Sequence, residues 1–430
     1  MKKVGLVSLG CHKNLVDSEN ILGLFDRNGY EITNDPAQSD IIVVNTCGFI
    51  ESSKKESIEN ILEMLNYGKK VVVTGCLVER YLEELKKEIP EVDVYIPIRE
   101  YSKFNDHLYL LDKSIDKSLG VDDDYRIVST GPFSAYLKIG EGCDNRCSYC
   151  AIPLIRGHFV SRNMSEIIKE AKDLASNRIK EIVVLEQDTT KYGIDFHDPN
   201  INIVTLLKEL LKIEGLEYIR LLYLYPDEIS DELIDLMGNE PRLTPYFDVP
   251  IQHSESHILK DMYRRGDKEF LLNLFNKIRN KVPHAILRTT VMVGFPGESE
   301  EDVDNLISFM NLVKFDHLGA FSYSQEEGTP AAEFPHQIEE DVKKSRLDKV
   351  MKAQQKISYI QNKKHIDEIM EGLVIGTDHD NYLLRSYWNA PDDVDGKIYF
   401  KSDKPLNIGD KAKVKITNVF VYDLMGEYVE

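Results

Sequence analysis

The sequence has no uncharged apolar run that approaches the roughly 18 residues needed to cross a bilayer. It also has no surplus of basic residues: 73 Asp and Glu residues outnumber 53 Lys and Arg residues, and the formal net charge is −20. The first absence argues against a membrane protein. The second disfavours a nucleic-acid phosphate backbone as main partner and permits a basic one, although acidity also serves solubility alone. We expect a cytoplasmic protein.

The composition excludes disordered, fibrous and disulfide-rich miniprotein classes. Hydrophobic residues make up 42% and charged residues 29% of the 430 residues, which is close to the globular average. At roughly 100 to 200 residues per domain, the chain has room for two to four domains with buried cores.

Cysteine is scarce, with six residues in 430, and its distribution is informative. Three cysteines are scattered through the first hundred residues and three fall within eight: the N-terminal triplet is Cys11, Cys47 and Cys76, and the central triplet is Cys143, Cys147 and Cys150. Disulfides need an oxidising compartment, and structural zinc usually takes four ligands. A three-cysteine site instead suits an iron–sulfur cluster whose fourth iron stays open for another ligand.

Strand-like and helix-like segments alternate in the first hundred residues. The strands are expected at Lys3 to Ser8, Asp40 to Asn45 and Lys70 to Thr74, with helices from about Asp17 and from Ser52 to Leu65. This βαβα order predicts a doubly wound parallel sheet. Each cysteine of the N-terminal triplet directly follows one of these strands, so we expect the three thiols at one sheet edge. Taken singly, each would be read as a buried core cysteine.

A second α/β region follows a polar, acidic segment from about Asp112 to Thr130, which contains Asp122, Asp123 and Asp124 and is expected to be a linker. The expected strands are Ala135 to Ile139, Glu181 to Gln187, Tyr218 to Tyr225, Tyr246 to Gln252, Ala285 to Val293 and Leu318 to Tyr323. Helical patterns separate them, among them Ser165 to Ser176, Val204 to Ile213, Lys268 to Lys281 and Glu300 to Val313. Six βα units are too few for a closed eightfold barrel, so we expect a partial (β/α)6 barrel.

The pattern of short strands in the last part of the chain predicts a small β-barrel. A charged helical stretch from about Glu339 to Lys363 leads to short strands with turn signals that continue to Glu430. The resulting division is an N-terminal domain over residues 1–125, a central domain over 130–362 and a C-terminal barrel over 363–430.

The central triplet lies in the run Gly142-Cys143-Asp144-Asn145-Arg146-Cys147-Ser148-Tyr149-Cys150, a C-x3-C-x-Φ-C motif directly after the first barrel strand. This motif resembles that of the radical S-adenosylmethionine superfamily. The resemblance implies that the three thiolates hold a 4Fe-4S cluster whose unique iron is chelated by S-adenosylmethionine. An electron from the cluster then cleaves the sulfonium and yields a 5′-deoxyadenosyl radical that removes hydrogen from unactivated carbon.

Other segments match that superfamily by position. The run from Val291 to Glu298 resembles the stretch that lines the cofactor, and two further strand ends carry polar residues toward the cofactor or substrate. The implied cofactor-binding residues are Tyr149, Gln187, Gln252, Ser254, Val293, Gly294, Pro296 and Gly297. An ordinary Gly-Pro-Gly turn, helix capping or loop solvation would explain several of them equally well.

The three domains together resemble the radical S-adenosylmethionine methylthiotransferases, whose C-terminal barrel is of the TRAM type. This resemblance implies a second 4Fe-4S cluster on the N-terminal triplet, whose open iron carries a sulfide or methylthio group. One S-adenosylmethionine donates methyl to that sulfur, and another generates the radical. A non-catalytic iron–sulfur binding or electron-transfer protein is the alternative from another class, but it would normally have four thiolates per cluster.

Within that family, the runs Gly10 to Glu19 and Asp248 to Ser254 resemble the RimO branch, which modifies an aspartate β-carbon in small-subunit ribosomal protein S-twelve. The alternative is a tRNA adenosine methylthiotransferase of the MiaB type, which usually has different residues in both runs. Between His365 and Glu430 the chain has 13 acidic and seven basic residues, which suits a basic protein partner better than RNA.

We therefore expect the ribosomal protein and an unidentified electron donor as partners, and no tRNA. Acidic residues of the tail such as Asp392, Asp393 and Asp395 are expected to help capture the substrate. Tyr387 and Trp388 could stack on a base, although a place in the barrel core is the simpler interpretation.

Overall fold

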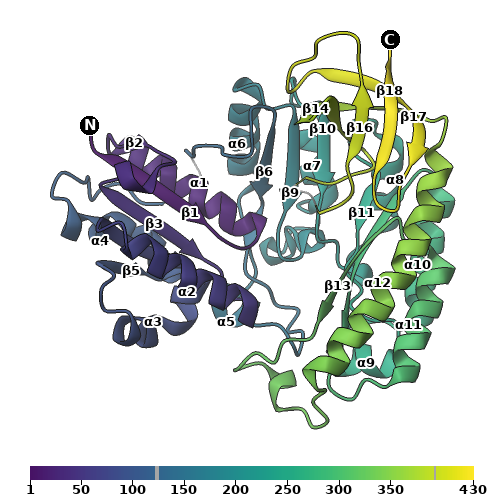
Figure 1. Cartoon of the computed structure of the whole chain (residues 1–430), viewed down its shortest axis with the longest axis horizontal. Coiled ribbons are helices and arrows are strands. Elements are labelled where there is room, and N and C mark those ends of the chain that lie inside the picture. The colour runs from purple at the N-terminus through teal and green to yellow at the C-terminus, as the bar shows by residue number, and fades with distance from the viewer. Residues whose placement is uncertain (122–124, 392–393) are drawn as a thin grey trace.

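The computed structural model of the chain describes residues 1–121, 125–391 and 394–430 and shows three regions that pack side by side (Figure 1). In chain order they are a parallel sheet between helices, an arc of six strands with helices outside it, and a closed five-stranded barrel. The three-part architecture predicted from the sequence is confirmed. Among the described residues, no helix is both long and apolar enough to cross a membrane.

The N-terminal region contains a parallel sheet with the strand order β2-β1-β3-β4-β5. Its strands are β1 (Lys3–Ser8), β2 (Glu31–Ile32), β3 (Ile41–Thr46), β4 (Lys70–Gly75) and β5 (Val94–Ile96), and its helices are α1 (His12–Arg27), α2 (Glu51–Leu65), α3 (Cys76–Glu88) and α4 (Phe104–Leu111). Helices α1 and α4 cover one face through Phe25 and Phe104, and α2 and α3 cover the other through Ile61 and Leu85. Because both faces are covered, β3 is buried along its whole length.

The segment between α4 and the central region connects the two regions but is not a free linker. Ile115 is buried in the N-terminal core, and Ile127 packs against the same core. The guanidinium of Arg126 pairs with Glu19 of α1 at 2.6 Å and with Glu170 of the central region at 3.0 Å. The Asp122 to Asp124 run lies outside the described residues.

The central region is an open arc of parallel strands, ordered β6-β9-β10 and β11-β12-β13, with a parallel bridge between Ile219 and Leu243 joining the halves. The strands are β6 (Ser134–Lys138), β9 (Glu181–Leu185), β10 (Tyr218–Leu221), β11 (Tyr246–Asp248), β12 (Ile286–Val293) and β13 (His317–Ser322), and a separate hairpin pairs β7 (Gly140–Glu141) with β8 (Val160–Ser161). Strands β10 and β11 end earlier than predicted, at Leu221 and Asp248, and beyond them Tyr223 and Gln252 adopt left-handed backbone with φ of 61° and 69°.

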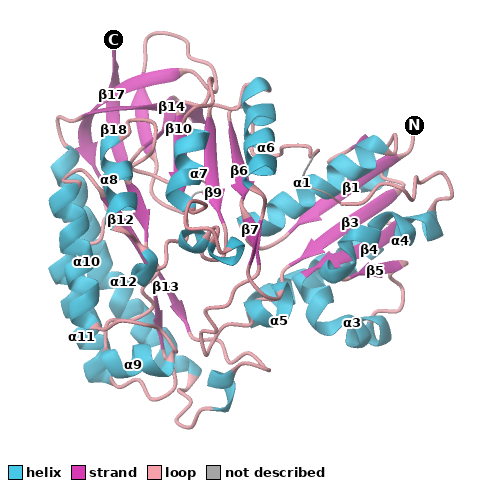
Figure 2. Cartoon of the chain, turned by 180° about the vertical axis from the view of Figure 1, so that it is seen from behind, coloured by secondary structure: helices cyan, strands magenta, loops and turns pink. Residues whose placement is uncertain are grey.

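Eight helices accompany this arc. They are α5 (Ile152–Arg156), α6 (Met164–Ser176), α7 (Ile203–Leu210), α8 (Asp231–Asn239), α9 (Ser256–Asp261), α10 (Lys268–Lys281), α11 (Glu300–Val313) and α12 (Glu340–Asn362). Figure 2 shows α10, α11 and α12 along the outside of β12 and β13. The outward residues of the strands and the helices form one large apolar core, which leaves the inner face of the arc for other contacts.

The C-terminal region is a closed barrel with the order β14-β15-β16-β18-β17. Its strands are β14 (Ile369–Asp378), β15 (Asn381–Ser386), β16 (Ile398–Lys401), β17 (Lys411–Val419) and β18 (Leu424–Val429). Trp388 is fully buried, and the Tyr387 hydroxyl donates to Glu368. Trp388 is therefore a core residue rather than a base-stacking one.

One apolar core joins all three regions. It contains Val16 of α1, Tyr136 and Tyr246 from the inner face of the arc, and Trp388 and Ile416 of the barrel. The barrel thus closes the amino end of the arc, while α1 lies against the edge strand β6.

A buried aspartate fixes the barrel to the arc and corrects one expectation. The side chain of Asp395 is 1% exposed, accepts a hydrogen bond from Tyr246 at 2.5 Å, and lies 3.5 Å from Arg288 and 3.7 Å from His317. Burial opposes its charge, but His317 and Arg288 lower the pKa of Asp395. The prediction that Asp395 belongs to an exposed substrate-capturing surface is wrong. Asp392 and Asp393 lie outside the described residues.

Candidate active site

The N-terminal triplet lies at the carboxyl edge of three neighbouring strands. Cys11 follows β1 and caps α1, Cys47 follows β3, and Cys76 opens α3 directly after β4. Gly10 has φ of +91°, and a Cβ there would lie 2.7 Å from the Cβ of Cys47. Only glycine fits so close to the second thiol at this backbone angle. The fold thus brings together three cysteines that are distant in sequence.

Burial and the neighbouring thiols disfavour the thiolate form at this triplet. Burial raises the pKa of Cys47 and raises the pKa of Cys76 to about 11, and Cys11 adds to both shifts. Arg156 of the central region opposes the second shift, because its Nη2 lies 3.4 Å from the Cys76 Sγ. The positive ends of α1 and α3 also favour a thiolate at this edge.

The central triplet lies in the loop between β7 and α5. Ser148, inside this loop, donates its N–H to the Met262 carbonyl at 3.1 Å, and its own carbonyl accepts from the Ala331 N–H at 2.8 Å. Gly142 has φ of +78°, and a Cβ there would lie 2.0 Å from the His158 carbonyl oxygen. The loop is therefore anchored to the segments that follow β11 and β13.

An aromatic and a cationic side chain face the middle thiol of this loop. The Sγ of Cys147 lies 3.8 Å from the Tyr225 hydroxyl and 3.9 Å from Nη1 of Arg264, and the Arg264 guanidinium lies 4.1 Å from the centre of the Tyr225 ring. Burial raises the pKa of Cys150 and raises that of Cys143 to about 11, with Cys147 adding to both shifts.

Both triplets fit an iron–sulfur cube. Within the described parts of the chain, no three His, Cys, Asp or Glu side chains converge on a single metal ion. A cube spreads its protein ligands, one on each of three irons, so neighbouring thiols that do not share one centre suit it. Coordination would deprotonate the buried thiols despite their raised pKa values.

The predicted cofactor turn after β12 lies beside the central triplet. Phe295 packs with Tyr149, the aromatic residue of the motif, in a small apolar cluster. Gly294 has φ of +75° and donates its N–H to Glu298 at 2.8 Å. His253, five residues after the end of β11, lies 3.5 Å from the same carboxylate. The turn is thus connected to the loop of the central triplet and to the segment that follows β11.

The other predicted cofactor residues occupy different environments. Pro296 is buried, and Gly297 is exposed with φ of +83°. Gln252 exchanges backbone hydrogen bonds with β12, and the buried Ser254 hydroxyl has no partner among the described residues. The side chain of Val293 packs into the outer core with the helices, so it points away from the interior of the arc.

Polar side chains are buried between the two triplets. Lys13, two residues after Cys11, is 7% exposed, and burial opposes its charge, yet Cys11 and other acidic neighbours raise its pKa. Lys13 in turn favours the thiolate of Cys150. At the end of β9, burial raises the pKa of Glu186 to about 8, and neither of its carboxylate oxygens has a hydrogen-bond partner in the described structure. Next to it, Gln187 donates to Glu141 at 3.2 Å.

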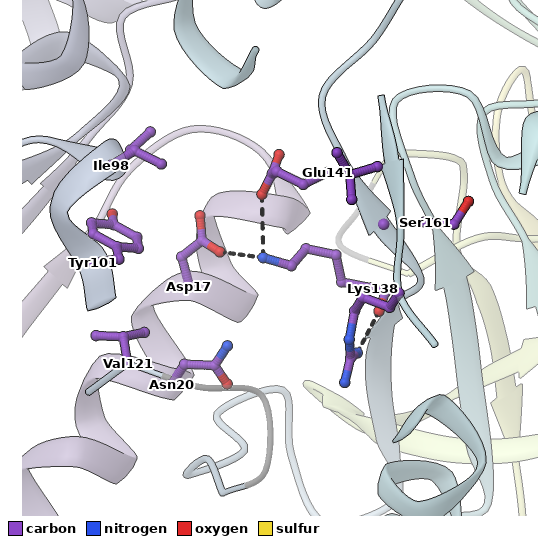
Figure 3. Close-up of a pocket in the computed structure, with 11 residues that line it drawn as sticks. Asp17, Asn20, Ile98, Tyr101, Val121, Lys138, Glu141 and Ser161 are labelled. Atoms are coloured by element: carbon purple, nitrogen blue, oxygen red, sulfur yellow. Dashed lines mark hydrogen bonds and ion pairs between the residues drawn. The ribbon is translucent and has the colours of Figure 1, made fainter. Parts of the chain in front are cut away.

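A pocket of about 300 Å³ lies at the same junction, between α1 and the β7–β8 hairpin (Figure 3). Asp17 accepts a hydrogen bond from Lys138 at 2.6 Å, and Glu141 lies 3.3 Å from the same ammonium. Arg156 also donates to Asp17 at 2.6 Å. Because these charges satisfy one another, we interpret this pocket as a structural junction.

Sequence reasoning missed five residues of this site: Lys13, Arg156, Glu186, Tyr225 and Arg264. Signals for four of them were present. Glu186 precedes Gln187 at a strand end and satisfies the same positional argument, and Arg156 is the one charged residue in the short apolar helix α5. Lys13 stands in the run Gly10 to Glu19, and Tyr225 ends the third predicted strand of the arc. Arg264 occupies its place through tertiary packing.

Family profiles match each region separately. The uncharacterized protein family UPF0004 matches residues 3–97, the radical SAM superfamily residues 137–310 and the TRAM domain residues 365–429. Among solved structures, the radical S-adenosylmethionine methyltransferase TsrM from Kitasatospora setae has a TM-score of 0.55 at 15% identity and covers 77% of each chain. The cobalamin-dependent radical enzyme OxsB has a TM-score of 0.51 at 14% identity, over 82% of this chain and 56% of its own. Both likenesses concern the fold alone.

Curated relatives match the whole chain. The ribosomal protein uS12 methylthiotransferase RimO of Acetivibrio thermocellus is 45% identical over 450 residues, which cover 100% of this chain and 98% of that protein. RimO of Alkaliphilus oremlandii is 46% identical over 432 residues, with 99% and 98% covered. The chain therefore belongs to the RimO family of radical S-adenosylmethionine methylthiotransferases.

Proposed function

We propose that this enzyme inserts a methylthio group at the β-carbon of an aspartate in uS12, the small-subunit ribosomal protein S-twelve. The observation that supports this most directly is that Cys76 of the N-terminal triplet packs in one buried cluster with Ala151, the residue after Cys150 of the central triplet. Sulfur insertion at carbon needs a radical source and a sulfur source near one substrate atom, and two adjoining three-thiolate sites meet that need.

We assign one 4Fe-4S cluster to each triplet and S-adenosylmethionine to the central one. When bound, these groups supply the methyl group, the sulfur and a radical that removes hydrogen from carbon. The chain's own part is to hold three thiols at each site, to leave the fourth coordination position open and to exclude water. The residues proposed to contact S-adenosylmethionine are Tyr149, Gln187, Gln252, Ser254, Gly294, Pro296, Gly297 and the backbone of Val293.

The proposed working division is residues 1–125 for the sulfur-donating domain, 130–362 for the radical domain and 363–430 for substrate recognition. The net charge of −20 suits a basic ribosomal protein and disfavours tRNA. An electron donor is required in addition, and the place of action is the cytoplasm, where ribosomal proteins are made.

A direct competition tests this proposal. The reconstituted enzyme is incubated with uS12 and with unmodified tRNA, and both are analysed by mass spectrometry. We expect uS12 alone to gain about 46 Da, the methylthio-for-hydrogen exchange. The same gain on tRNA with none on uS12 would replace this assignment by that of a tRNA-modifying enzyme.

A further inference from the structure

The first turn of α1 inserts into the open side of the arc. His12 stacks on Tyr136 of β6 with 4.5 Å between ring centres, and Val16 packs in the core shared with the barrel. Lys13, between them in sequence, points its ammonium to within 4.2 Å of the centre of the Tyr223 ring, just beyond β10. Lys13, two residues after Cys11, therefore lies inside the radical domain.

The aromatic floor under Lys13 is held in an unusual backbone conformation. Tyr223 has φ of 61°, which a bulky residue rarely adopts. Its N–H donates to Asp248 at 3.0 Å, and its carbonyl accepts from the Thr189 N–H at 3.1 Å. These contacts fix the ring beneath the ammonium, and such strain is typically retained at functional positions.

The ammonium of Lys13 has no ion pair within the described parts of the chain, although the residue is only 7% exposed. It has three N–H donors, yet in the described parts of the chain no acceptor lies within hydrogen-bond or ion-pair distance, and its contact is the Tyr223 ring. The other buried lysine at this junction, Lys138, is paired with Asp17 at 2.6 Å. Its donors are therefore available to an acceptor from outside the chain.

We propose that Lys13 is the residue that binds the carboxylate of the target aspartate, an inference that rests on the proposed function. The ammonium lies over the Tyr223 ring, just beyond β10 of the arc, and Lys13 follows Cys11 of the N-terminal triplet by two residues, so it lies near the place where a substrate carbon has to meet both reacting groups. In an aspartate side chain the carboxyl carbon is bonded directly to the β-carbon. Holding the carboxylate therefore places the β-carbon within two bonds of the Lys13 contact, and selects aspartate over its neutral isostere asparagine.

Peptide binding tests the role of Lys13 without relying on turnover. A labelled uS12 peptide with the target aspartate and a matched peptide with asparagine are titrated with the reconstituted enzyme, and fluorescence anisotropy gives both affinities. Loss of a charge-assisted hydrogen bond costs about 1.5–3 kcal/mol, so we expect the wild type to prefer aspartate by about 10- to 100-fold. K13M, of similar length but uncharged, should bind both peptides equally, and K13R should keep the preference.

The control is K138M, which removes the other buried lysine of the junction and should lower both affinities alike without changing their ratio. Iron content and circular dichroism verify that K13M is folded, and the comparison of the two peptides on wild type needs no variant. If K13M keeps the aspartate preference, or the wild type has none, the role of Lys13 is refuted although methylthiolation of uS12 stands. If the wild type neither binds nor modifies uS12, the proposed function fails and this inference fails with it.

Discussion

Arg156 joins the two cysteine-bearing regions, and its replacement by methionine should loosen their contact. Its side chain is 2% exposed and donates to Asp17 at 2.6 Å, to Glu141 at 3.1 Å and to Asn14 at 3.1 Å, while Nη2 lies 3.4 Å from Cys76. Methionine fills similar space but donates nothing.

The size of the effect follows from burial. Removing one partner of a buried ion pair costs about 3–5 kcal/mol. Asp17 keeps Lys138 as a partner at 2.6 Å, and Glu141 is 31% exposed, so the lower end applies. A loss of about 3 kcal/mol corresponds to a roughly 100-fold larger population of the undocked state.

Amide hydrogen exchange reports this opening directly. In R156M, we expect exchange in α1 to be about 100-fold faster, while exchange in the outer helices α10 and α11 stays as in the wild type. Cleavage of S-adenosylmethionine should persist, because each triplet stays intact. The amount of methylthio product should fall, because the two triplets no longer keep a fixed position relative to each other.

The matched control is R99M. Arg99 pairs with Glu79 at 2.6 Å but is 54% exposed, so its loss should cost less than about 1 kcal/mol. If α1 exchanges at the same rate in R156M as in R99M, Arg156 does not join the regions and the reasoning from burial is wrong.

Four further predictions follow from the same structure. Alanine at all three positions of the central triplet should leave about half of the iron of a reconstituted chain; full retention would contradict the assignment. Alanine throughout the N-terminal triplet should preserve S-adenosylmethionine cleavage and abolish methylthio product, so normal product would show that the sulfur comes from elsewhere. D395N should lower the urea midpoint at neutral pH, since it removes the charge that faces Arg288 and His317, whereas an exposed control such as D403N should not; equal midpoints would contradict the buried anchor. Glu186 has its pKa raised to about 8 in the fold against about 4.3 in the unfolded chain, so stability should fall as pH rises between these values. E186Q should remove that slope in urea titrations, and parallel pH profiles would argue against a buried, protonated Glu186.

The positions of the cysteines were predictable because a parallel sheet has a fixed polarity. Cys47 and Cys76 follow continuous apolar runs, which are typical of parallel strands buried on both faces of the sheet. The carboxyl ends of such strands meet at one edge of the sheet. Alternation along β12 would also have placed Val293 outward, because Arg288 and Met292 face the interior.

The contacts between regions were not predictable in the same way. His12, Lys13 and Val16 form an ordinary start of an amphipathic helix, and nothing local shows that they enter another region. Asp395 stands in an acidic, polar stretch of the sequence, a pattern typical of the surface. Its burial depends on Tyr246 and Arg288, which are distant in sequence, so only the assembled fold reveals it.

The core shared by Val16, Tyr246 and Trp388 also dictates an order of biosynthesis. The ribosome releases the last strands of the barrel only after the arc has been made, so until then the inner face of the arc has no cover at its amino end. A nascent chain of this enzyme consequently exposes that apolar surface late, and early termination near residue 365 should produce a chaperone-dependent or degraded product. Grafting a different C-terminal barrel onto this enzyme would require redesign of α1 as well.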